Sequence, residues 1–390
     1  MDNSKYFVSY ILADSRYFNE VMTADITNCA MNCEGPYFSE EARTFAVFWI
    51  GSWSILCCFS TLITVITFFL DMQRFEYPER PIIFLSGCYL MVSIGYIIRL
   101  AAGHKAVACD GDYIRYQTTG PALCTIVFLL IYFFGMASSI WWVLLSFTWF
   151  LAAGLKWGQE AIASYSQYFH LVAWLVPSIK AITILATSNI DGDPVSGICY
   201  VGNQNMTNLR GFVLAPLILY LLLGTSFLLA GFVSLFRIRD AIRQQGQQRT
   251  EKLEKLMIRI GIFSVLYTVP ATIVIACHFY EQHFRHEWET TITCPCNNSG
   301  AKPDYSVFML KYFMCLAVGI TSGFWVWSSK TLTSWRNIGS NSCCRRRAAD
   351  KTKYATVTYT TATMIAQPPA PPASNKGSSY TAPSCPPSHV

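Results

Sequence analysis

Residues 124–151 read CTIVFLLIYFFGMASSIWWVLLSFTWFL and contain no Asp, Glu, Lys or Arg. A helix rises about 1.5 Å per residue, so about 20 apolar residues cross a hydrocarbon core about 30 Å thick. This stretch therefore predicts a membrane-spanning helix. The whole chain agrees, because 53% of its 390 residues are apolar or aromatic and only 13% are charged, whereas soluble domains carry about 25% charged residues.

The same hydropathy recurs along the chain. Six further stretches are long and apolar enough to span a bilayer: Phe45–Leu70, Ile82–Ala102, Phe169–Thr187, Phe212–Phe236, Ile260–Tyr280 and Phe308–Ser328. With the span Cys124–Leu151 they predict an all-α membrane protein, built as a bundle of seven transmembrane helices. Arg99, Lys180 and Lys311 lie near span ends, where we expect their side chains to snorkel to the headgroups.

The distribution of Lys and Arg predicts the orientation of the bundle. One set of segments, made of the connections 71–81, 152–168 and 237–259 and the tail after residue 328, contains 18 Lys and Arg residues. The other set, made of the first 44 residues and the connections 103–123, 188–211 and 281–307, contains 8. Cytoplasmic segments carry the excess of basic residues. We therefore expect an extracellular N-terminus and a cytoplasmic C-terminus. Two N-glycosylation sequons, at Asn205 and Asn297, fall on the extracellular side.

We expect four segments in the chain. They are an extracellular segment and hinge (1–44), the seven-transmembrane domain (45–328), a short amphipathic helix on the membrane surface (329–338) and a disordered cytoplasmic tail rich in Pro and Ser (339–390). The apolar stretch Tyr6–Ala13 is a weak candidate for a signal peptide, so we favour a short extracellular segment there.

Motifs of enzymes are absent from the sequence, which contains no HExxH, GxSxG, P-loop or dinucleotide fingerprint. We therefore expect no enzymatic activity, no cofactor and no nucleic-acid partner. His278, His283 and His286, followed by Cys294 and Cys296, could suggest zinc, but their spacing is irregular and we favour disulfides at these cysteines. The span centres carry no carboxylate, which argues against an ion or proton pathway.

The cysteines on the extracellular side predict disulfides. Cys124 opens the third span and Cys199 lies in the next extracellular loop, so a bond between them would pin that loop over the bundle. Cys33 and Cys109 form a second plausible pair. Cys29 and the two cysteines at 294 and 296 are left without an assigned partner. The cysteines inside the spans are expected to pack in the core.

Two cytoplasmic segments have helical patterns. Residues 251–260 place Leu253, Leu256 and Met257 on one helical face, although a simple extension of the sixth span would give the same pattern. Residues 330–336, KTLTSWR, can lie along the membrane surface with Trp335 at the interface.

The tail carries two weaker signals. Cys343 and Cys344, beside three arginines, are candidates for palmitoylation, and a basic stop next to the membrane is the alternative. Ser388 and Val390 match the ending that a PDZ domain binds by adding a strand to its sheet.

Four motifs taken together resemble a frizzled receptor. They are YPERP at 77–81, FFGMASS at 133–139, LEKLM at 253–257 and the pattern Lys-Thr-x-x-x-Trp at 330–335. The resemblance extends from about Ile26 to Arg336 and is greatest to the frizzled-five and frizzled-eight branch. A generic rhodopsin-type receptor is disfavoured, because Asp-Arg-Tyr after the third span and Asn-Pro-x-x-Tyr in the seventh are both missing.

The resemblance implies a plasma membrane receptor of the Wnt pathway. Its partners would be a Wnt ligand, a co-receptor related to the low-density-lipoprotein receptor, intracellular Dishevelled, membrane lipid and, in addition, heterotrimeric G proteins and PDZ proteins. It assigns Dishevelled docking to Lys330, Thr331, Trp335, Leu253, Lys255, Leu256 and Met257. It also implies an activation switch between Arg259 and Trp325.

One large part of the family pattern is not matched. The extracellular cysteine-rich domain that binds Wnt has no counterpart in residues 1–28. The resemblance therefore does not extend to direct Wnt binding by this chain, whereas the cytoplasmic motifs are complete. The alternative function is a non-signalling membrane partner that binds a full-length frizzled and titrates Dishevelled.

Overall fold

The structure is a computed structural model of the chain. It describes residues 8–10, 18–19, 21–24, 26–33, 37–72, 77–244, 250–293 and 302–326. The chain divides into two compact units, Met1–Leu332 and Thr333–Val390. All described residues belong to the first unit, so the predicted surface helix at 329–338 and the predicted tail lie outside the description.

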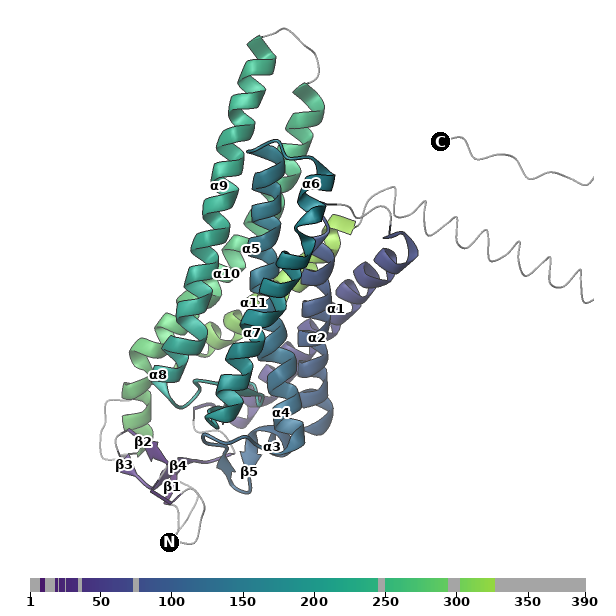
Figure 1. The fold of residues 1–390 in the computed structure, drawn as a ribbon. Helices are drawn as coiled ribbons and strands as arrows, with labels where there is room; N and C mark the ends of the chain where they lie inside the picture. Colours follow the sequence, from purple (N-terminus) through teal and green to yellow (C-terminus); the bar gives the residue numbers. More distant parts are fainter. Residues whose placement is uncertain are drawn as a thin grey trace, which may run out of the picture. The chain divides into compact units, whose positions relative to one another are not determined.

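Long helices form a bundle in this unit (Figure 1). Their bounds are α1 Glu40–Leu70, α2 Pro81–Ala102, α4 Ala122–Phe128, α5 Phe134–Ala153, α7 Ser166–Ala186, α9 Ala215–Gln244, α10 Thr250–Thr293 and α11 Tyr305–Val326. The π-helical turn η3 (Leu129–Phe133) joins α4 to α5 in one continuous rod. The short α8 (Met206–Asn208) and the π-helical η4 (Leu209–Leu214) lead in the same way into α9. Two short helices, α3 (His104–Ala108) and α6 (Gln159–Ser164), lie in connections.

The helices confirm the predicted transmembrane architecture. Six of them, within the described residues, are long and apolar enough to cross a membrane: Glu40–Leu70, Pro81–Ala102, Ala122–Ala153, Ser166–Ala186, Met206–Asp240 and Tyr305–Gly323. The predicted sixth span, Ile260–Tyr280, lies inside α10. This helix is 44 residues long and extends beyond the predicted span at both ends.

Local sequence explains where the first two helices begin. Ser39 caps α1, because its hydroxyl accepts a hydrogen bond from the Ala42 amide, and Glu40 and Glu41 favour the positive end of the helix dipole. Pro81 occupies the first position of α2, where its missing N–H costs no hydrogen bond.

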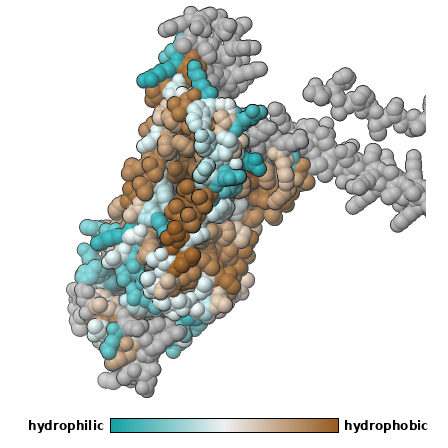
Figure 2. All heavy atoms as spheres, in the orientation of Figure 1, coloured by the Kyte–Doolittle hydropathy of each residue, from teal (hydrophilic) through white to brown (hydrophobic). Residues whose placement is uncertain are grey.

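Apolar side chains cover the outside of the bundle as well as its interior. Phe48, Ile182 and Leu229 are more than 60% exposed, as expected for side chains that face lipid. Figure 2 shows the hydrophobic colour along the middle of the helices and more hydrophilic residues toward their ends. The spans therefore present an apolar belt to the membrane.

Large aromatic rings fill the centre of the bundle. Trp141 and Trp142 on α5 are fully buried. The Trp141 ring stacks on Phe84 of α2, with a centroid distance of 4.5 Å, and the Trp142 ring stacks on Tyr267 of α10 at 4.2 Å. Gly224 of α9 makes room for Trp142, because a Cβ at this glycine would lie 2.0 Å from the ring carbon Cζ3. α5 therefore holds α2, α9 and α10 together.

Short β-ribbons at one end of the bundle modify the predicted all-α class (Figure 1). The antiparallel pairs are β1 (Val8–Tyr10) with β4 (Cys29–Met31), β2 (Met22–Thr23) with β3 (Ile26–Thr27), β5 (Cys109–Asp110) with β6 (Tyr113–Ile114) and β7 (Ile190–Gly192) with β8 (Cys199–Val201). All lie in segments expected outside the cell, and we call this the outer end. The opposite end, where α6 lies and α10 begins, is the inner end.

Candidate functional site

The predicted docking segment of the inner end lies in the first turns of α10. Leu253, Lys255, Leu256 and Met257 all fall within this helix, but their side chains lie outside the described part. The helical backbone gives Leu253, Leu256 and Met257 the spacing of one helix face. The predicted docking residues Lys330, Thr331 and Trp335 are not among the described residues.

The two residues of the predicted switch lie on neighbouring helices. Arg259 belongs to α10 and Trp325 to the last turn of α11, and α10 packs against α11. The structure describes the backbone of both positions but not their side chains. The other predicted sites at Asn297, Cys343, Cys344, Ser388 and Val390 lie outside the described residues.

Two disulfides fasten the outer end. They join Cys33 to Cys109 and Cys124 to Cys199, the two pairs expected from the sequence. The second bond ties β8 to the start of α4, and so holds the loop between α7 and α8 over the bundle. Cys29 and the described cysteines of the spans are free thiols, and Cys29, Cys57, Cys88 and Cys277 are buried.

Asp193 fixes the turn of this loop and links it to α11. Its Oδ1 accepts hydrogen bonds from the Val195 and Ser196 amides, at 2.8 and 3.1 Å. Its Oδ2 accepts from the Ser196 hydroxyl at 2.8 Å and from the Tyr312 hydroxyl at 3.0 Å. All four acceptor positions of the carboxylate are therefore used.

A buried charge cluster joins α10 to α11 just below the outer end. The Glu281 carboxylate pairs with Arg285, and its Oε2 lies 3.1 Å from Lys311 Nζ and 3.7 Å from His278 Nδ1. Arg285 Nη1 also donates to the Gly202 carbonyl at 2.9 Å, which connects the cluster to the extracellular loop. All four side chains of the cluster are more than 90% buried. The cluster therefore ties two spans and one loop to each other.

The expected snorkelling of three basic residues is wrong. Lys311 points inward because Glu281 offers it a buried counter-charge. Arg99 is only 3% exposed. Lys180 reaches sideways from α7 to α9, where its Nζ lies 3.4 Å from the Tyr220 hydroxyl and 5.4 Å from the centre of that ring. Lys311 and Lys180 thus each have a polar or aromatic group within the bundle that competes with the headgroups, whereas Arg99 is enclosed by packing with its Nε unpaired.

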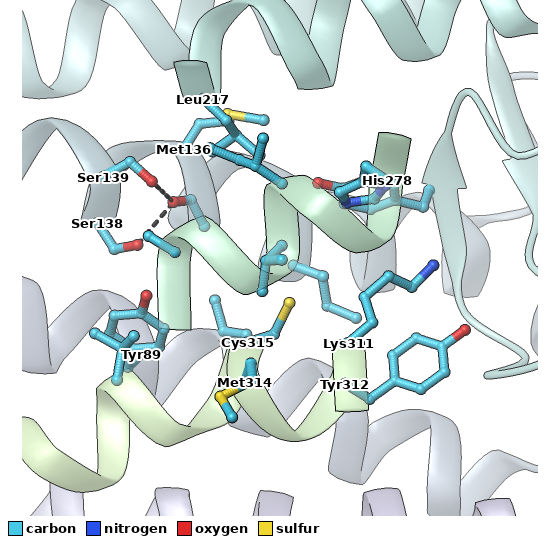
Figure 3. A pocket seen from close by; sticks show the side chains of 18 of the residues that line it. Tyr89, Met136, Ser138, Ser139, Leu217, His278, Lys311, Tyr312, Met314 and Cys315 are labelled. Atoms are coloured by element: carbon cyan, nitrogen blue, oxygen red, sulfur yellow. Dashed lines mark hydrogen bonds between the residues drawn. The ribbon is translucent and has the colours of Figure 1, made fainter. Parts of the chain in front are cut away.

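A cavity of about 140 Å³ lies between the helices, below the charge cluster. Figure 3 shows His278, Lys311 and Tyr312 on one side of it and Tyr89, Ser138 and Ser139 on the other. The hydroxyls of both serines donate to the Gly135 carbonyl of their own helix. Most of the remaining lining is apolar or aromatic, including Trp142 and Tyr267. The cavity thus has a charged end toward the outer face and a largely apolar body.

Two titratable groups of the extracellular connections have shifted pKa values. Burial raises the pKa of Asp191 to about 6, although the Gln117 and Gln204 amides donate to its carboxylate and oppose the shift. Burial, followed by the charge of Arg99, lowers the pKa of His104 to about 4. Because both pKa values differ from those of the free side chains, the stability of the outer end should depend on pH in the acidic range.

The glycosylation sequon at Asn205 stands at a helix start. The Asn205 Oδ1 caps α8 by accepting hydrogen bonds from the Thr207 and Asn208 amides, and the Thr207 side chain is exposed. The sequon therefore lies at the outer end, on the side expected from the sequence.

Two of the zinc ligands considered from the sequence, Cys294 and Cys296, lie outside the described residues. Within the described residues, the one group of potential ligands close enough to share a metal is Cys33, Cys109 and His104, and its two sulfurs form a disulfide. His278 belongs to the charge cluster, and His283 packs edge-on against Phe284.

Sequence reasoning missed the charge cluster. The spacing of His278, Glu281 and Arg285 by three and four residues was a usable signal, because it places them on one face of a helix. Hydropathy alone, however, places the polar flank of the sixth span in a connection between spans. The link from Tyr312 to Asp193 spans 119 positions and leaves no local pattern.

Comparison with known proteins places these features in a family. The chain matches the family described as the Frizzled/Smoothened family membrane region over residues 37–342. It is 67% identical to Frizzled-5 of Xenopus laevis over 341 residues, which cover 87% of this chain and 61% of that protein. Frizzled-5 of Homo sapiens is 65% identical over 352 residues, which cover 88% of this chain and 60% of that protein. Frizzled-8 of Xenopus laevis is 67% identical over 350 residues, which cover 87% of this chain and 60% of that protein. The chain spans about three fifths of the length of these relatives.

Proposed function

The chain belongs to the Frizzled/Smoothened family of multi-pass plasma membrane proteins, and from this premise we propose that it is a Wnt-pathway receptor that recruits Dishevelled. Recruitment would occur at the inner end and drive β-catenin or planar polarity signalling. The observation that carries the proposal is the presence of both cytoplasmic motifs, LEKLM at 253–257 and Lys-Thr-x-x-x-Trp at 330–335, inside the matched region.

The docking surface combines these two segments. The helical backbone of α10 supports an apolar face made by Leu253, Leu256 and Met257. Thr331 and Trp335 are four residues apart and would share a face if their segment is helical. Trp335 would then anchor the segment at the headgroup level, and Lys330 would face the rim of the bundle.

A contact between Arg259 and Trp325 would control access to this surface. An arginine over an indole ring contributes about 0.5–2 kcal/mol. This energy is small enough for a partner to overcome through stronger binding to the open state. Arg259→Ala is therefore expected to increase Dishevelled recruitment.

Recruitment in cells tests the docking assignment. Fluorescent Dishevelled is expressed with the wild-type chain, with Trp335→Ala or with Lys330→Ala, in cells without endogenous frizzled receptors. We expect the wild type to bring Dishevelled to the membrane and each variant to lose most of this recruitment at normal surface expression. A β-catenin reporter separates the two functions, because recruitment without a reporter response favours the titrating partner.

The connection between α5 and α6 offers matched controls. Lys156 and Trp157 are exposed on the same expected side of the membrane but lie outside both motifs. Lys156→Ala and Trp157→Ala should recruit Dishevelled like the wild type. Equal recruitment by the Lys330 and Trp335 variants and the wild type would contradict the proposed docking surface.

The remaining sites are proposed with the same function. Wnt would act on the receptor together with a co-receptor, and G proteins would use the inner end. We further propose glycans at Asn205 and Asn297, palmitoyl groups at Cys343 and Cys344, and a PDZ partner for Ser388 and Val390. Mass spectrometry of protein purified from animal cells would detect the glycans and the acyl groups.

A further inference from the structure

Lys180 is a cation inside a membrane span without a counter-charge. It lies in α7, six residues before the outer end of this helix at Ala186, and therefore about 9 Å below that end. Its side chain is only partly buried. Within the part of the chain that the structure describes, Lys180 forms no ion pair, and its ammonium donates one hydrogen bond, to the Tyr220 hydroxyl at 3.4 Å. Ionisable residues inside a span are normally paired and often mark functional sites.

Lys180 and Tyr220 together form a pair of donors that lacks an acceptor. An ammonium has three N–H donors, and a phenol hydroxyl donates one hydrogen bond in addition to those it accepts. The Tyr220 hydroxyl accepts from Lys180, and among the described residues none accepts the proton of this hydroxyl or a second hydrogen bond from the ammonium. The unused N–H and O–H groups lie next to each other. A carboxylate would satisfy both side chains, because it has one negative charge and two acceptor oxygens.

This donor pair lies between two helices that face lipid. Both α7 and α9 pack against α5 (Figure 1), and Lys180 reaches from α7 to Tyr220 on α9. Ile179, Leu219 and Leu223 beside the pair are between 42% and 56% exposed, whereas Tyr220 is 8% exposed. The donors are therefore recessed behind apolar side chains that contact the acyl chains of the bilayer.

The recessed position favours a lipid over a protein as the source of the carboxylate. A neighbouring membrane helix is about 10–12 Å in diameter and would carry its carboxylate on a short side chain, which the exposed apolar residues hold away from Lys180. A second copy of this chain is also disfavoured, because the centres of its spans contain no carboxylate. A single acyl chain that ends in a carboxylate can pass between the two helices.

Depth in the membrane then selects the kind of lipid. The 21 residues of α7 give a length of about 30 Å, which matches the hydrocarbon core. The phosphates of phospholipids lie beyond the outer end of the helix, and the Lys180 ammonium is directed sideways to α9. A fatty acid has neither glycerol nor a phosphate headgroup, so its carboxylate can reach Lys180 while its chain stays in the core.

We propose that Lys180 and Tyr220 bind the carboxylate of an unesterified long-chain fatty acid, whose chain lies along the lipid-facing side of α7 and α9. The Lys180 ammonium supplies the positive charge, and the Tyr220 hydroxyl donates a hydrogen bond to the carboxylate. Tyr220 also lines the central cavity, so the fatty acid would fix one wall of this cavity from the lipid side. By joining α7 to α9, it would stabilise the folded bundle.

Thermal unfolding with matched lipids tests the site. The purified full chain in phosphatidylcholine nanodiscs is heated with oleic acid or with methyl oleate, which has the same chain but no carboxylate, in an alkaline buffer that keeps the acid ionised. A ligand that binds only the folded state raises the melting temperature. We expect oleic acid to raise it by about 3 °C or more, with a saturable dose dependence, and methyl oleate to leave it unchanged.

Variants locate the effect. Lys180→Met keeps the length of the side chain and should unfold at the same temperature with oleic acid and with methyl oleate. Tyr220→Phe keeps the ring, should bind oleic acid several-fold more weakly, and serves as the test if Lys180→Met does not fold. Lys302→Met is the control, because Lys302 is an exposed lysine of the outer end, and it should keep the full effect of oleic acid.

Several results would overturn the proposal. One is a wild-type protein with the same melting temperature in both lipids, and another is a Lys180→Met or Tyr220→Phe variant that keeps the full effect. Equal stabilisation by anionic phosphatidylglycerol would place a phosphate at Lys180. Stabilisation by a leucine-rich membrane helix with one Asp, without an effect of oleic acid, would place a partner helix there.

Discussion

A basic residue near the end of a membrane span has two ways to satisfy its charge. It can snorkel to the headgroups, or it can turn inward to a counter-charge. Lys311 turns inward because Glu281, on the neighbouring helix, lies 3.1 Å from its amine. The sequence shows the position of Lys311 but not its direction, since the choice depends on a residue 30 positions away. The buried charges were therefore the part of the molecule least accessible to sequence reasoning.

The ion pair between Lys311 and Glu281 should be needed for stability. Lys311→Met leaves the buried Glu281 carboxylate with Arg285 as its remaining strong partner. Removing one member of a buried ion pair lowers the free energy of unfolding by about 3–5 kcal/mol. Because Arg285 still pairs with Glu281, we expect a decrease near the lower limit of this range. Thermal unfolding in nanodiscs measures it.

A second substitution separates charge from packing. Glu281→Gln combined with Lys311→Met should recover part of the lost stability, because neither charge is then left unpaired. Lys302→Met removes an exposed outer-end lysine and should be neutral. A Lys311→Met variant as stable as the wild type would show that the pair is not stabilising.

His104 and Asp191 should give the folded state opposite responses to acid. The pKa of His104 is lowered to about 4, so the unfolded state takes up this proton first and stability falls as the pH drops from about 6.5 to 4. The pKa of Asp191 is raised to about 6, so the folded state takes up that proton first and stability rises as the pH drops from about 6 to 4.

Single substitutions should reveal each response. Relative to the wild type, His104→Gln should gain stability as the pH falls from about 6 to 4, whereas Asp191→Asn should lose stability over the same range. Melting temperatures measured across this range test both signs. Parallel curves for the two variants would contradict the assignment.

At the scale of elements, hydropathy predicted the spans to within a few residues. The inner end of α9 and both ends of α10 were the exceptions, because residues 237–244, 250–259 and 281–293 are helical but too polar to be recognised as part of a span. The β-ribbons were also missed. Strands of two or three residues are too short to show alternation, and they are held by pairing and disulfides rather than by local preference.

The contact between α5 and α9 should depend on Gly224. A Cβ at this position would lie 2.0 Å from Trp142 Cζ3, and the fully buried indole has no room to move away. We expect Gly224→Ala to cost about 1–3 kcal/mol through overpacking.

Another glycine of the same rod is the control. Gly211 in η4 has no atom within 4 Å of the position that a Cβ would take, so Gly211→Ala should be tolerated. Thermal unfolding of both variants compares the two sites. Equal stability of the Gly224 and Gly211 variants would show that the helices can separate without cost.

At the scale of the whole molecule, the orientation in the membrane follows from charge. The basic residues are concentrated in the segments expected inside the cell, by 18 to 8, and both disulfides lie at the opposite end. Epitope tags at the two termini test this arrangement. We expect the N-terminal tag to be stained on intact cells and the C-terminal tag only after permeabilisation. Staining of the C-terminal tag on intact cells would rule out seven spans with an extracellular N-terminus.

The two disulfides also constrain how the chain is made. Their cysteines are separated by 76 and 75 positions, and a ribosome adds about 5–20 residues per second. Each first cysteine must therefore wait at least about 4–15 seconds for its partner to be synthesised. Cys33 waits while two hydrophobic segments are inserted, and Cys124 while the next two are. During these intervals the thiols are open to oxidoreductases of the secretory pathway, so maturation of the outer face is coupled to the timing of translation.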